Sequence, residues 1–277
     1  FTKFKRFFEL PGSIQDKERS ERIQEKLLKL KKSCSLEGEQ LKNETSKIRC
    51  IGLTIETKPD WGKLIQGNEM LRLGCTRIEL GIESVYEDVL KKTNRGHTLK
   101  DTIESIRILK DLGFKINAHY MLGLYKYGKE DLEGLNELFS NSDFRPDMLK
   151  IYPCLVMPGT PLYELWKRGQ YKEITTDEAS ELISEFKRNV PSYLRIHRIN
   201  RDIPTKVTIA GVDRTNLRQY VHEKLKQKGI KCRCIRCREP GRINVEDYKI
   251  LVQKYKASKG TEFFISAENK ENDVILG

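Results

Sequence analysis

Apolar and polar residues alternate in four short stretches in the middle of the chain. These stretches are Ile48–Glu56, Cys75–Glu83, Phe114–Leu122 and Leu149–Val156. In each, aliphatic or aromatic residues recur at every second position, and polar residues or glycines lie between them. This period of two is typical of a β-strand with one apolar face. Helical periodicity separates the strands, as between Thr98 and Gly113, where a threonine N-cap and a terminal glycine bound the pattern.

The strand–helix–strand repeat predicts parallel β/α units, because parallel strands need a crossover connection. A sheet covered on both faces would carry aliphatic residues on both. Polar residues on one face therefore favour a barrel or half-barrel whose lumen holds a cofactor. An open sheet with solvated polar positions is the alternative. In such barrels the chemistry lies at the carboxyl ends of the strands, where Glu56, Glu83 and His119 fall.

The flanking segments have weaker signals. Asp16 to Lys32 has the spacing of an amphipathic surface helix, whereas Ser33 to Ser46 has no period and predicts a loop. Beyond the barrel we expect a strand at Ile203–Val212, a helix from about Thr215 to Gly229 and a hairpin from Thr261 to Leu276.

The charge is concentrated in one part of the chain. Residues 191–242, here called the basic segment, contain 14 Lys and Arg against 4 Asp and Glu, a net charge of +10 out of the chain's +12. A localised basic segment suits a polyanion such as RNA, although a solvated basic face explains the charge alone equally well. The candidate RNA-binding residues are Arg198, Arg201, Arg214, Arg218, Lys231, Arg233, Arg236 and Arg238.

Three cysteines lie inside the basic segment. Cys232, Cys234 and Cys237, here called the cysteine cluster, offer three soft ligands for a structural zinc ion, and such a site needs a fourth. We favour His197 over His222 as that ligand, because His222 lies on a helix among charged residues. The alternatives are three reduced thiols without a metal, or iron in place of zinc.

The remaining signals concern the compartment. No apolar run approaches the ~18 residues of a membrane span, and no hydrophobic signal core opens the chain. Seven cysteines at irregular spacing argue against a disulfide framework. We interpret the other four, Cys34, Cys50, Cys75 and Cys154, as structural or incidental. We therefore expect a cytoplasmic protein with reduced thiols and no membrane partner.

Six motifs resemble those of a known family. Gly74-Cys-Thr-Arg-Ile-Glu-Leu-Gly-Ile-Glu-Ser84, Thr93-Asn-Arg-Gly-His-Thr98 and His119-Tyr-Met-Leu-Gly-Leu124 resemble the core of radical S-adenosylmethionine (SAM) enzymes. Lys150-Ile-Tyr-Pro153, Pro158-Gly-Thr-Pro-Leu-Tyr-Glu-Leu-Trp166 and Arg198-Ile-Asn-Arg-Asp-Ile-Pro204 resemble, more narrowly, the family of the Elongator catalytic subunit. The resemblance covers most of the chain from Ile48 onward.

The resemblance implies an enzyme that modifies tRNA. In this family a radical-SAM domain with a [4Fe-4S] cluster is fused to an acetyltransferase domain, and together they add a carboxymethyl group from acetyl-CoA to C5 of the wobble uridine. Further partners would be other Elongator subunits or a second copy of the chain. By motif position, the residues that would contact SAM are Glu56, Glu83, Arg95 and His119. Lys150 and Tyr152 are candidates for the barrel lumen near the substrate.

The chain departs from the family pattern in two places. The cluster-binding cysteines that precede the first strands have no counterpart, and the tail resembles only the opening strands of the acetyltransferase domain. We therefore expect a radical-SAM core at 1–190, a basic zinc-binding linker at 191–260 and the start of an acetyltransferase domain at 261–277. This chain alone should be catalytically inactive. The competing function is a non-catalytic, zinc-stabilised RNA-binding scaffold.

Overall fold

The computed structural model describes the chain except for residues 14, 200–202, 204–206, 242–244 and 272. The chain divides into two compact units, Phe1–Ile51 and Gly52–Gly277. Each unit is described by itself.

The first unit consists of three helices, α1 (Thr2–Phe7), α2 (Lys17–Leu30) and α3 (Leu36–Thr45). The predicted surface helix is confirmed by α2, which the Asp16 carboxylate caps by accepting a hydrogen bond from the Arg19 N–H at 2.9 Å. The predicted loop is wrong, because α3 lies there. None of its residues is buried, so it has no apolar stripe from which sequence periodicity could identify it.

The second unit is built on a five-stranded parallel sheet. Its strands are β1 (Leu53–Thr57), β2 (Cys75–Glu83), β3 (Lys115–Leu122), β4 (Met148–Pro153) and β5 (Arg195–Ile199), in the spatial order β1-β2-β3-β4-β5. Because each strand adds beside the previous one and parallel crossovers are right-handed, the connecting helices cover the same face of the sheet. The other face remains available for polar residues.

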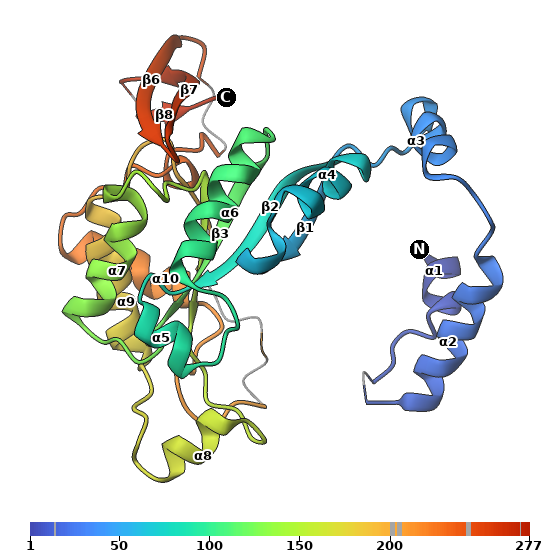
Figure 1. The fold of residues 1–277 in the computed structure, drawn as a ribbon, viewed down its shortest axis with the longest axis horizontal. Coiled ribbons are helices and arrows are strands. Elements are labelled where there is room, and N and C mark those ends of the chain that lie inside the picture. Colours follow the sequence, from blue (N-terminus) through green and yellow to red (C-terminus); the bar gives the residue numbers. More distant parts are fainter. Residues whose placement is uncertain (14, 200–202, 204–206, 242–244, 272) are drawn as a thin grey trace. The chain divides into compact units, whose positions relative to one another are not determined.

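Helices connect the strands, as Figure 1 shows. Those between β1 and β5 are η1 (Pro59–Trp61), α4 (Leu64–Arg72), α5 (Glu87–Lys92), α6 (Leu99–Asp111), α7 (Lys129–Ser140), α8 (Pro161–Lys167) and α9 (Thr176–Arg188), and α10 (Leu217–Gln227) and η3 (Ile235–Cys237) follow β5. Reciprocal side-chain and backbone hydrogen bonds, between Thr98 and Asp101 and between Thr175 and Glu178, fix the starts of α6 and α9. The predicted N-cap at Thr98 is thereby confirmed.

The hydrophobic core fills the space between the helices and the apolar face of the sheet. Ile78, Leu80, Ile116, Leu149 and Ile151 are fully buried there. Each such side chain contributes about 1.5–3 kcal/mol to folding by leaving water. The intervening strand residues form the polar face, so the expected α/β architecture of a partial radical-SAM barrel is confirmed.

A small antiparallel sheet closes the second unit. It contains β6 (Lys249–Ala257), β7 (Gly260–Asn269) and β8 (Val274–Ile275). It is attached through Tyr193, whose ring stacks on that of Tyr255 with centroids 4.0 Å apart. The hairpin predicted within the tail is β7 paired with β8, and β6 extends it to three strands.

Two further expectations concern the described residues only. The strand expected at 203–212 is not found among its described positions, where an isolated bridge joins Val156 and Ala210; positions 204–206 lie outside the described residues. Among the helices that the structure describes, none is long and apolar enough to cross a membrane.

Candidate functional site

A pocket of about 540 Å³ opens at the carboxyl ends of the parallel strands. Its size falls in the range of small-molecule sites. The sequence-predicted residues that line it are Glu56, Glu83, His119, Lys150, Tyr152 and Arg198, which the structure brings together from β1 to β5. Apolar side chains such as Met121, Leu124, Leu155 and Met157 complete the wall. The pocket thus combines an apolar surface with a few converging polar groups.

Glu83 and Arg95 form one side of this arrangement. Glu83 ends β2 with a positive φ of 60°, a backbone conformation that few non-glycine residues adopt. Nη2 of Arg95 donates hydrogen bonds to the Gly81 carbonyl at 3.0 Å and to Oε1 of Glu83 at 3.3 Å. Burial raises the pKa of Glu83, and the Arg95 charge opposes that shift. Arg95 therefore acts on the pocket through Glu83.

The centre of the polar face is Glu79, which the sequence analysis did not select. Its carboxylate pairs with the Lys150 ammonium, lies 3.1 Å from Nε2 of His119 and accepts a hydrogen bond from the Asn117 amide at 3.4 Å. Strand register explains the convergence: Glu79 lies between Glu56 and Asn117, and His119 lies beside Lys150. We call Glu79, Asn117, His119 and Lys150 the inner-face network.

Opposing effects set the charges of this network. Burial on its own would raise the pKa of Glu79, but Lys150 and His119 together lower it. Burial lowers the pKa of His119. At neutral pH these shifts favour an ionised Glu79 and a neutral His119 imidazole. Proton exchange at His119 would become possible only as the pH falls.

Glu56, Glu79 and His119 place three ligand atoms within 4.8 Å of one another. A metal ion at this position would compete with Lys150, which already neutralises Glu79. The trio is therefore better described as part of an ion-pair network than as a metal site. Tyr152 packs edge-on against the His119 ring, with centroids 5.4 Å apart, and shields one side of the imidazole.

The pocket fits the polar parts of SAM. Carboxylates such as Glu56 and Glu83 can accept hydrogen bonds from ribose hydroxyls and from an ammonium group. The [4Fe-4S] cluster that a radical-SAM fold implies is a different case. Cys154 is the only cysteine among the described residues that line the pocket, and burial raises its pKa to about 11. The described pocket residues therefore do not fit an iron–sulfur cluster.

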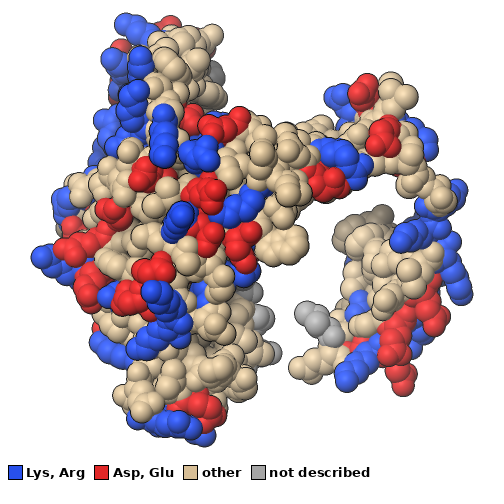
Figure 2. All heavy atoms as spheres, viewed as in Figure 1, with Lys and Arg blue, Asp and Glu red and all other residues tan. Residues whose placement is uncertain are grey.

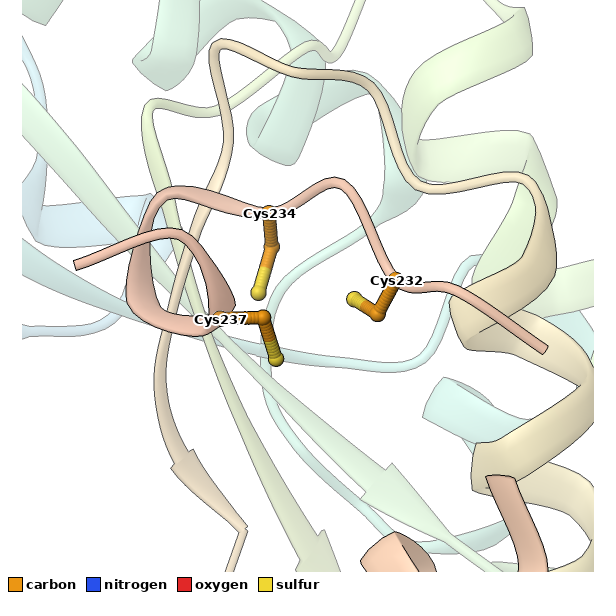
Figure 3. Close-up of side chains that lie close together, drawn as sticks. All are labelled: Cys232, Cys234 and Cys237. Atoms are coloured by element: carbon orange, nitrogen blue, oxygen red, sulfur yellow. The ribbon is translucent and has the colours of Figure 1, made fainter. Parts of the chain in front are cut away.

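The cysteine cluster lies on η3 and the loop before it. Figure 3 shows the three side chains close together, and their sulfur atoms lie within 4.8 Å of one another. Cys232 and Cys234 are buried, whereas Cys237 is exposed. Hydrogen bonds within the cluster lower the pKa of Cys234 and raise the pKa of Cys232, so the Cys234 thiolate forms at the expense of the Cys232 thiolate.

The structure does not bring His197 to the cysteine cluster. In β5, Ile196 is buried in the core, and the next residue along the strand takes the opposite face of the sheet. Nδ1 of His197 lies 3.0 Å from the Asn117 amide nitrogen, beside the inner-face network. His222 lies within the electrostatic influence of Cys234 on α10. Strand alternation therefore places His197 away from the thiols.

A residue that the sequence analysis missed lies directly on the cysteine cluster. Nζ of Lys187, on α9, is 3.4 Å from Sγ of Cys237 and 3.9 Å from Sγ of Cys234. Burial on its own would lower the pKa of Lys187, but the three cysteine sulfurs together raise it. Its separation of about fifty residues from the cysteines leaves no local pattern by which the sequence could identify it.

The candidate RNA residues divide by exposure. Arg238 is only 2% exposed; it pairs with Glu268 at 2.7 Å and donates to the carbonyls of Arg233 and Ser192. It joins the linker to β7, and burial removes it from the expected RNA surface. Half-buried Arg218 donates to the carbonyls of Ile196 and His197, with Nη2 at 3.4 and 3.3 Å.

The other candidates are exposed wherever they are described. These are Arg198, Arg214, Lys231, Arg233 and Arg236, while Arg201 lies outside the described residues. Some have acidic partners, as Lys231 has in Asp273 at 2.9 Å. On the face drawn in Figure 2, basic side chains gather along the C-terminal strands, whereas acidic and basic side chains intermingle over the helices.

Two family models match the chain. The model of the radical SAM superfamily matches residues 17–139, and that of the radical SAM C-terminal domain matches residues 146–227. A solved structure, the archaeal Methanocaldococcus infernus Elp3 with an N-terminus deletion (1-46), superimposes with a TM-score of 0.85 at 45% identity. It covers 89% of this chain and 60% of that chain.

Curated relatives agree with these matches. The chain is 46% identical over 255 residues to the tRNA uridine(34) acetyltransferase of Methanocaldococcus infernus, covering 89% of this chain and 48% of the relative. It is 43% identical over 242 residues to Elongator complex protein 3 of Homo sapiens, covering 85% and 44%. The chain thus spans about half the length of the curated relatives it matches. The chain thus has the domains of radical SAM proteins and is homologous, over most of its length, to the tRNA uridine(34) acetyltransferases and Elongator complex protein 3.

Proposed function

We propose that this chain provides the SAM-binding core and the RNA-facing linker of an enzyme that adds a carboxymethyl group from acetyl-CoA to C5 of the wobble uridine of tRNA. The observation that carries this proposal is the pocket at the strand ends, where residues from five consecutive strands meet and where Arg198, an exposed residue of the basic segment, forms part of the wall. The names of the relatives support the tRNA substrate. Partners would be other Elongator subunits or a second copy of the chain, in the cytoplasm.

The polar groups at the pocket suit the recognition of SAM. Glu56 and Glu83 would accept hydrogen bonds from the ribose hydroxyls and the methionyl ammonium group, and His119 would hold a neutral imidazole against the ligand. Arg95 would orient Glu83, as its hydrogen bond does in the structure. When bound with a [4Fe-4S] cluster, SAM supplies a carbon-centred radical. We assign no residue of this chain to that cluster.

Lys150 and Tyr152 would serve the substrate side of the pocket. Their register on β4 places Lys150 beside His119 and Tyr152 beside Met121. Lys150 would hold a positive charge, balanced by Glu79, where an anionic substrate group approaches. Tyr152 would offer an aromatic face and a hydroxyl to a base or an acyl group.

Binding of SAM separates this function from the scaffold alternative. Titration of SAM into the full chain should give saturable binding. Glu83→Ala should weaken this binding at least about tenfold, because it removes a charged group that accepts hydrogen bonds from SAM. Arg233→Glu with Arg236→Glu should leave SAM affinity unchanged. If the wild-type chain does not bind SAM but does bind tRNA, the scaffold function is the better description.

The basic segment would bind tRNA through its exposed residues. The double change Arg233→Glu and Arg236→Glu should weaken tRNA binding and reduce the slope of log affinity against log salt by about one to two. Lys100→Glu with Lys129→Glu is the matched control, since it makes the same charge change on exposed positions of α6 and α7. Equal losses in both double variants would mean that only net charge matters.

The cysteine cluster would hold a structural zinc ion. Three sulfur atoms within 4.8 Å of one another support this assignment. Metal analysis of the purified chain should find about one zinc per chain, because a closed thiolate site retains its metal. A wild-type chain that contains neither zinc nor another metal would remove the proposal.

A further inference from the structure

One ring nitrogen of His119 faces the pocket, and the other faces the buried carboxylate of Glu79. Both His119 and Glu56 line the pocket, and Oε1 of Glu56 lies 3.7 Å from Nδ1 of His119, beyond hydrogen-bond distance. Nε2 lies 3.1 Å from Oε2 of Glu79, whose side chain is only 8% exposed. The two nitrogens of one imidazole therefore have different partners.

The partner of Nε2 determines the tautomer of the neutral ring. Burial on its own would raise the pKa of Glu79, but Lys150 and His119 lower it, so this carboxylate is ionised and can only accept hydrogen bonds. Nε2 must then carry the hydrogen and donate it to Glu79. A neutral imidazole has a single N–H group, so the other lone pair lies on Nδ1. His119 therefore presents a hydrogen-bond acceptor to the pocket.

Lys150 determines whether the ring stays neutral. The charged and titratable groups that face the ring come from three strands, and they are Glu56 from β1, Glu79 from β2, and Lys150 and Tyr152 from β4. Burial lowers the pKa of His119; the two carboxylates raise it, and Lys150 lowers it. Because the Lys150 ammonium pairs with Glu79, this carboxylate can orient the ring without drawing a second proton onto it.

We infer that Glu79 and Lys150 are positioning residues for the ligand of the pocket: Glu79 holds the hydrogen of His119 on Nε2, and Lys150 keeps Nδ1 unprotonated, so that Nδ1 accepts a hydrogen bond from SAM. This inference rests on the SAM-binding function proposed above and deepens it. The donor is a hydroxyl or amino group of SAM. Because SAM also carries a positive sulfonium, a second proton on the ring would remove the acceptor and place a like charge in the pocket. Binding of SAM is therefore linked to the deprotonation of His119.

A titration of SAM into the full chain over a pH series tests this linkage. The wild-type affinity should be constant while His119 is neutral and should fall about tenfold per pH unit once the ring takes up a proton. Isotopic labelling of the histidine nitrogens reports the tautomer and the titration of His119 by NMR. The chain has 4 histidines, and the signal lost in His119→Gln identifies the ring. By reciprocity, saturating SAM should move the titration of His119 to lower pH.

Lys150→Met separates this role from a purely structural one. It removes the charge that lowers the proton affinity of His119 and leaves the carboxylate of Glu79 beside the ring. The titration of His119 and the pH profile of SAM affinity should both move up by at least about one pH unit. Adding Glu79→Gln removes the second charge and keeps an oxygen that accepts from Nε2–H, so the profile of this double variant should not move up.

Lys110→Met is the matched control for the loss of a lysine from a buried ion pair. The Lys110 side chain is 5% exposed and pairs with Asp147 and Glu262, none of which lines the pocket. This variant should keep the wild-type titration of His119 and the wild-type pH profile of SAM affinity.

The outcomes separate this inference from the function on which it rests. A wild-type chain that does not bind SAM overturns the SAM-binding function and this inference with it. Binding of SAM with the hydrogen on Nδ1 of His119, or without a shift in the titration of that ring, overturns the inference alone. So does a folded Lys150→Met variant whose profile stays in place. If that variant does not fold, the wild-type spectra and the double variant decide the question.

Discussion

Two lysines in this protein, Lys150 and Lys187, are buried, and they differ in the groups that can balance their charge. Lys150, on β4, pairs with the carboxylate of Glu79, which also contacts His119. Lys187, on α9, has the sulfur atoms of Cys234 and Cys237 as its partners. A carboxylate brings a full negative charge at neutral pH, whereas a thiol brings one only after it loses its proton. The first site is therefore balanced by the chain itself, and the second is balanced only with ionised sulfur or a metal.

The two sites should therefore differ in whether their structure depends on a bound ligand. The inner-face network should keep its geometry whether or not a ligand is bound, because its charges already match. The cysteine cluster should change its stability with metal and with redox conditions, because its thiols are free to ionise, coordinate or oxidise.

The largest expected effect is the removal of the zinc ion that we propose for the cysteine cluster. With free zinc at about a thousand times its Kd, zinc binding stabilises the folded chain by about 4 kcal/mol. A chelator that removes the zinc should lower the free energy of unfolding by the same amount. Urea denaturation of the full chain with and without chelator measures this difference. In the Glu79→Ala variant the chelator should lower the free energy of unfolding by the same amount as in the wild type, because the two lysine sites share no residue. A drop that depends on Glu79 would break the comparison.

The second effect is the loss of the Lys150 partner. Glu79→Ala should lower the free energy of unfolding by about 3 kcal/mol or more, because it leaves a buried ammonium without a counter-charge. Glu56→Ala is the control, since the Glu56 side chain is 66% exposed and should cost less than about 0.5 kcal/mol. Adding Lys150→Met to Glu79→Ala should recover most of the loss. Without such recovery, the charge balance at Lys150 is not what the carboxylate provides.

Arg238 tests whether the burial of a cation determines how much stability is lost when its side chain is removed. Arg238 is buried and bound to Glu268, whereas the Lys231 side chain is 75% exposed beside Asp273. Arg238→Ala should lower the free energy of unfolding by about 2 kcal/mol, because Oε2 of Glu268 and two backbone carbonyls lose the hydrogen bonds that Arg238 donates. Lys231→Ala should change stability by less than about 0.5 kcal/mol. Equal losses of stability in the two variants would show that exposure does not determine how much each ion pair contributes.

A fourth effect accumulates gradually with pH and comes from Asp131, a buried carboxylate that forms no ion pair with the described residues. Burial raises the pKa of Asp131 from 3.8 to about 7, while its oxygens accept hydrogen bonds from the Gly123 N–H and the Tyr120 hydroxyl. The folded state therefore holds this proton more tightly than the unfolded state. Relative to Asp131→Asn, the wild type should gain stability as the pH falls from about 7 to about 4, by up to about 1.4 kcal/mol per pH unit.

Glu79 should show the opposite trend. Its pKa is lowered in the folded state, so its contribution is present above its unfolded pKa and is lost as the pH falls through its folded pKa. Unfolding curves of Asp131→Asn and Glu79→Gln over the same pH series compare the two slopes. Slopes of the same sign would mean that Lys150 does not govern the ionisation of Glu79.

Local periodicity was enough to predict most of the fold. The alternation in β2 predicted Cys75–Glu83 without error, and Thr98 marked the start of α6. The same reasoning missed α3, because ten exposed residues leave no apolar pattern and only the Ser35 cap marks its start. Sequence thus predicts elements that bury a face and misses those that do not.

For the candidate site, the residues that the sequence identified differ from those it missed in whether their role depends on neighbouring strands. Glu56, Glu83 and His119 were identified because strand ends can be counted along the chain. Glu79 was missed because its role depends on the register with neighbouring strands, which brings Lys150 to it. Lys187 was missed for the same reason at longer range, and His197 was selected because sequence proximity does not reveal the face of a strand.

The order of strands in the sheet has a consequence for how the protein is made. Each strand from β2 to β5 pairs with the one that precedes it along the chain. Contacts between neighbours in sequence form with a small loss of chain entropy and can begin before the rest of the polypeptide exists. The sheet can therefore grow from its β1 edge as the ribosome delivers each new strand, with one exposed edge waiting at every stage.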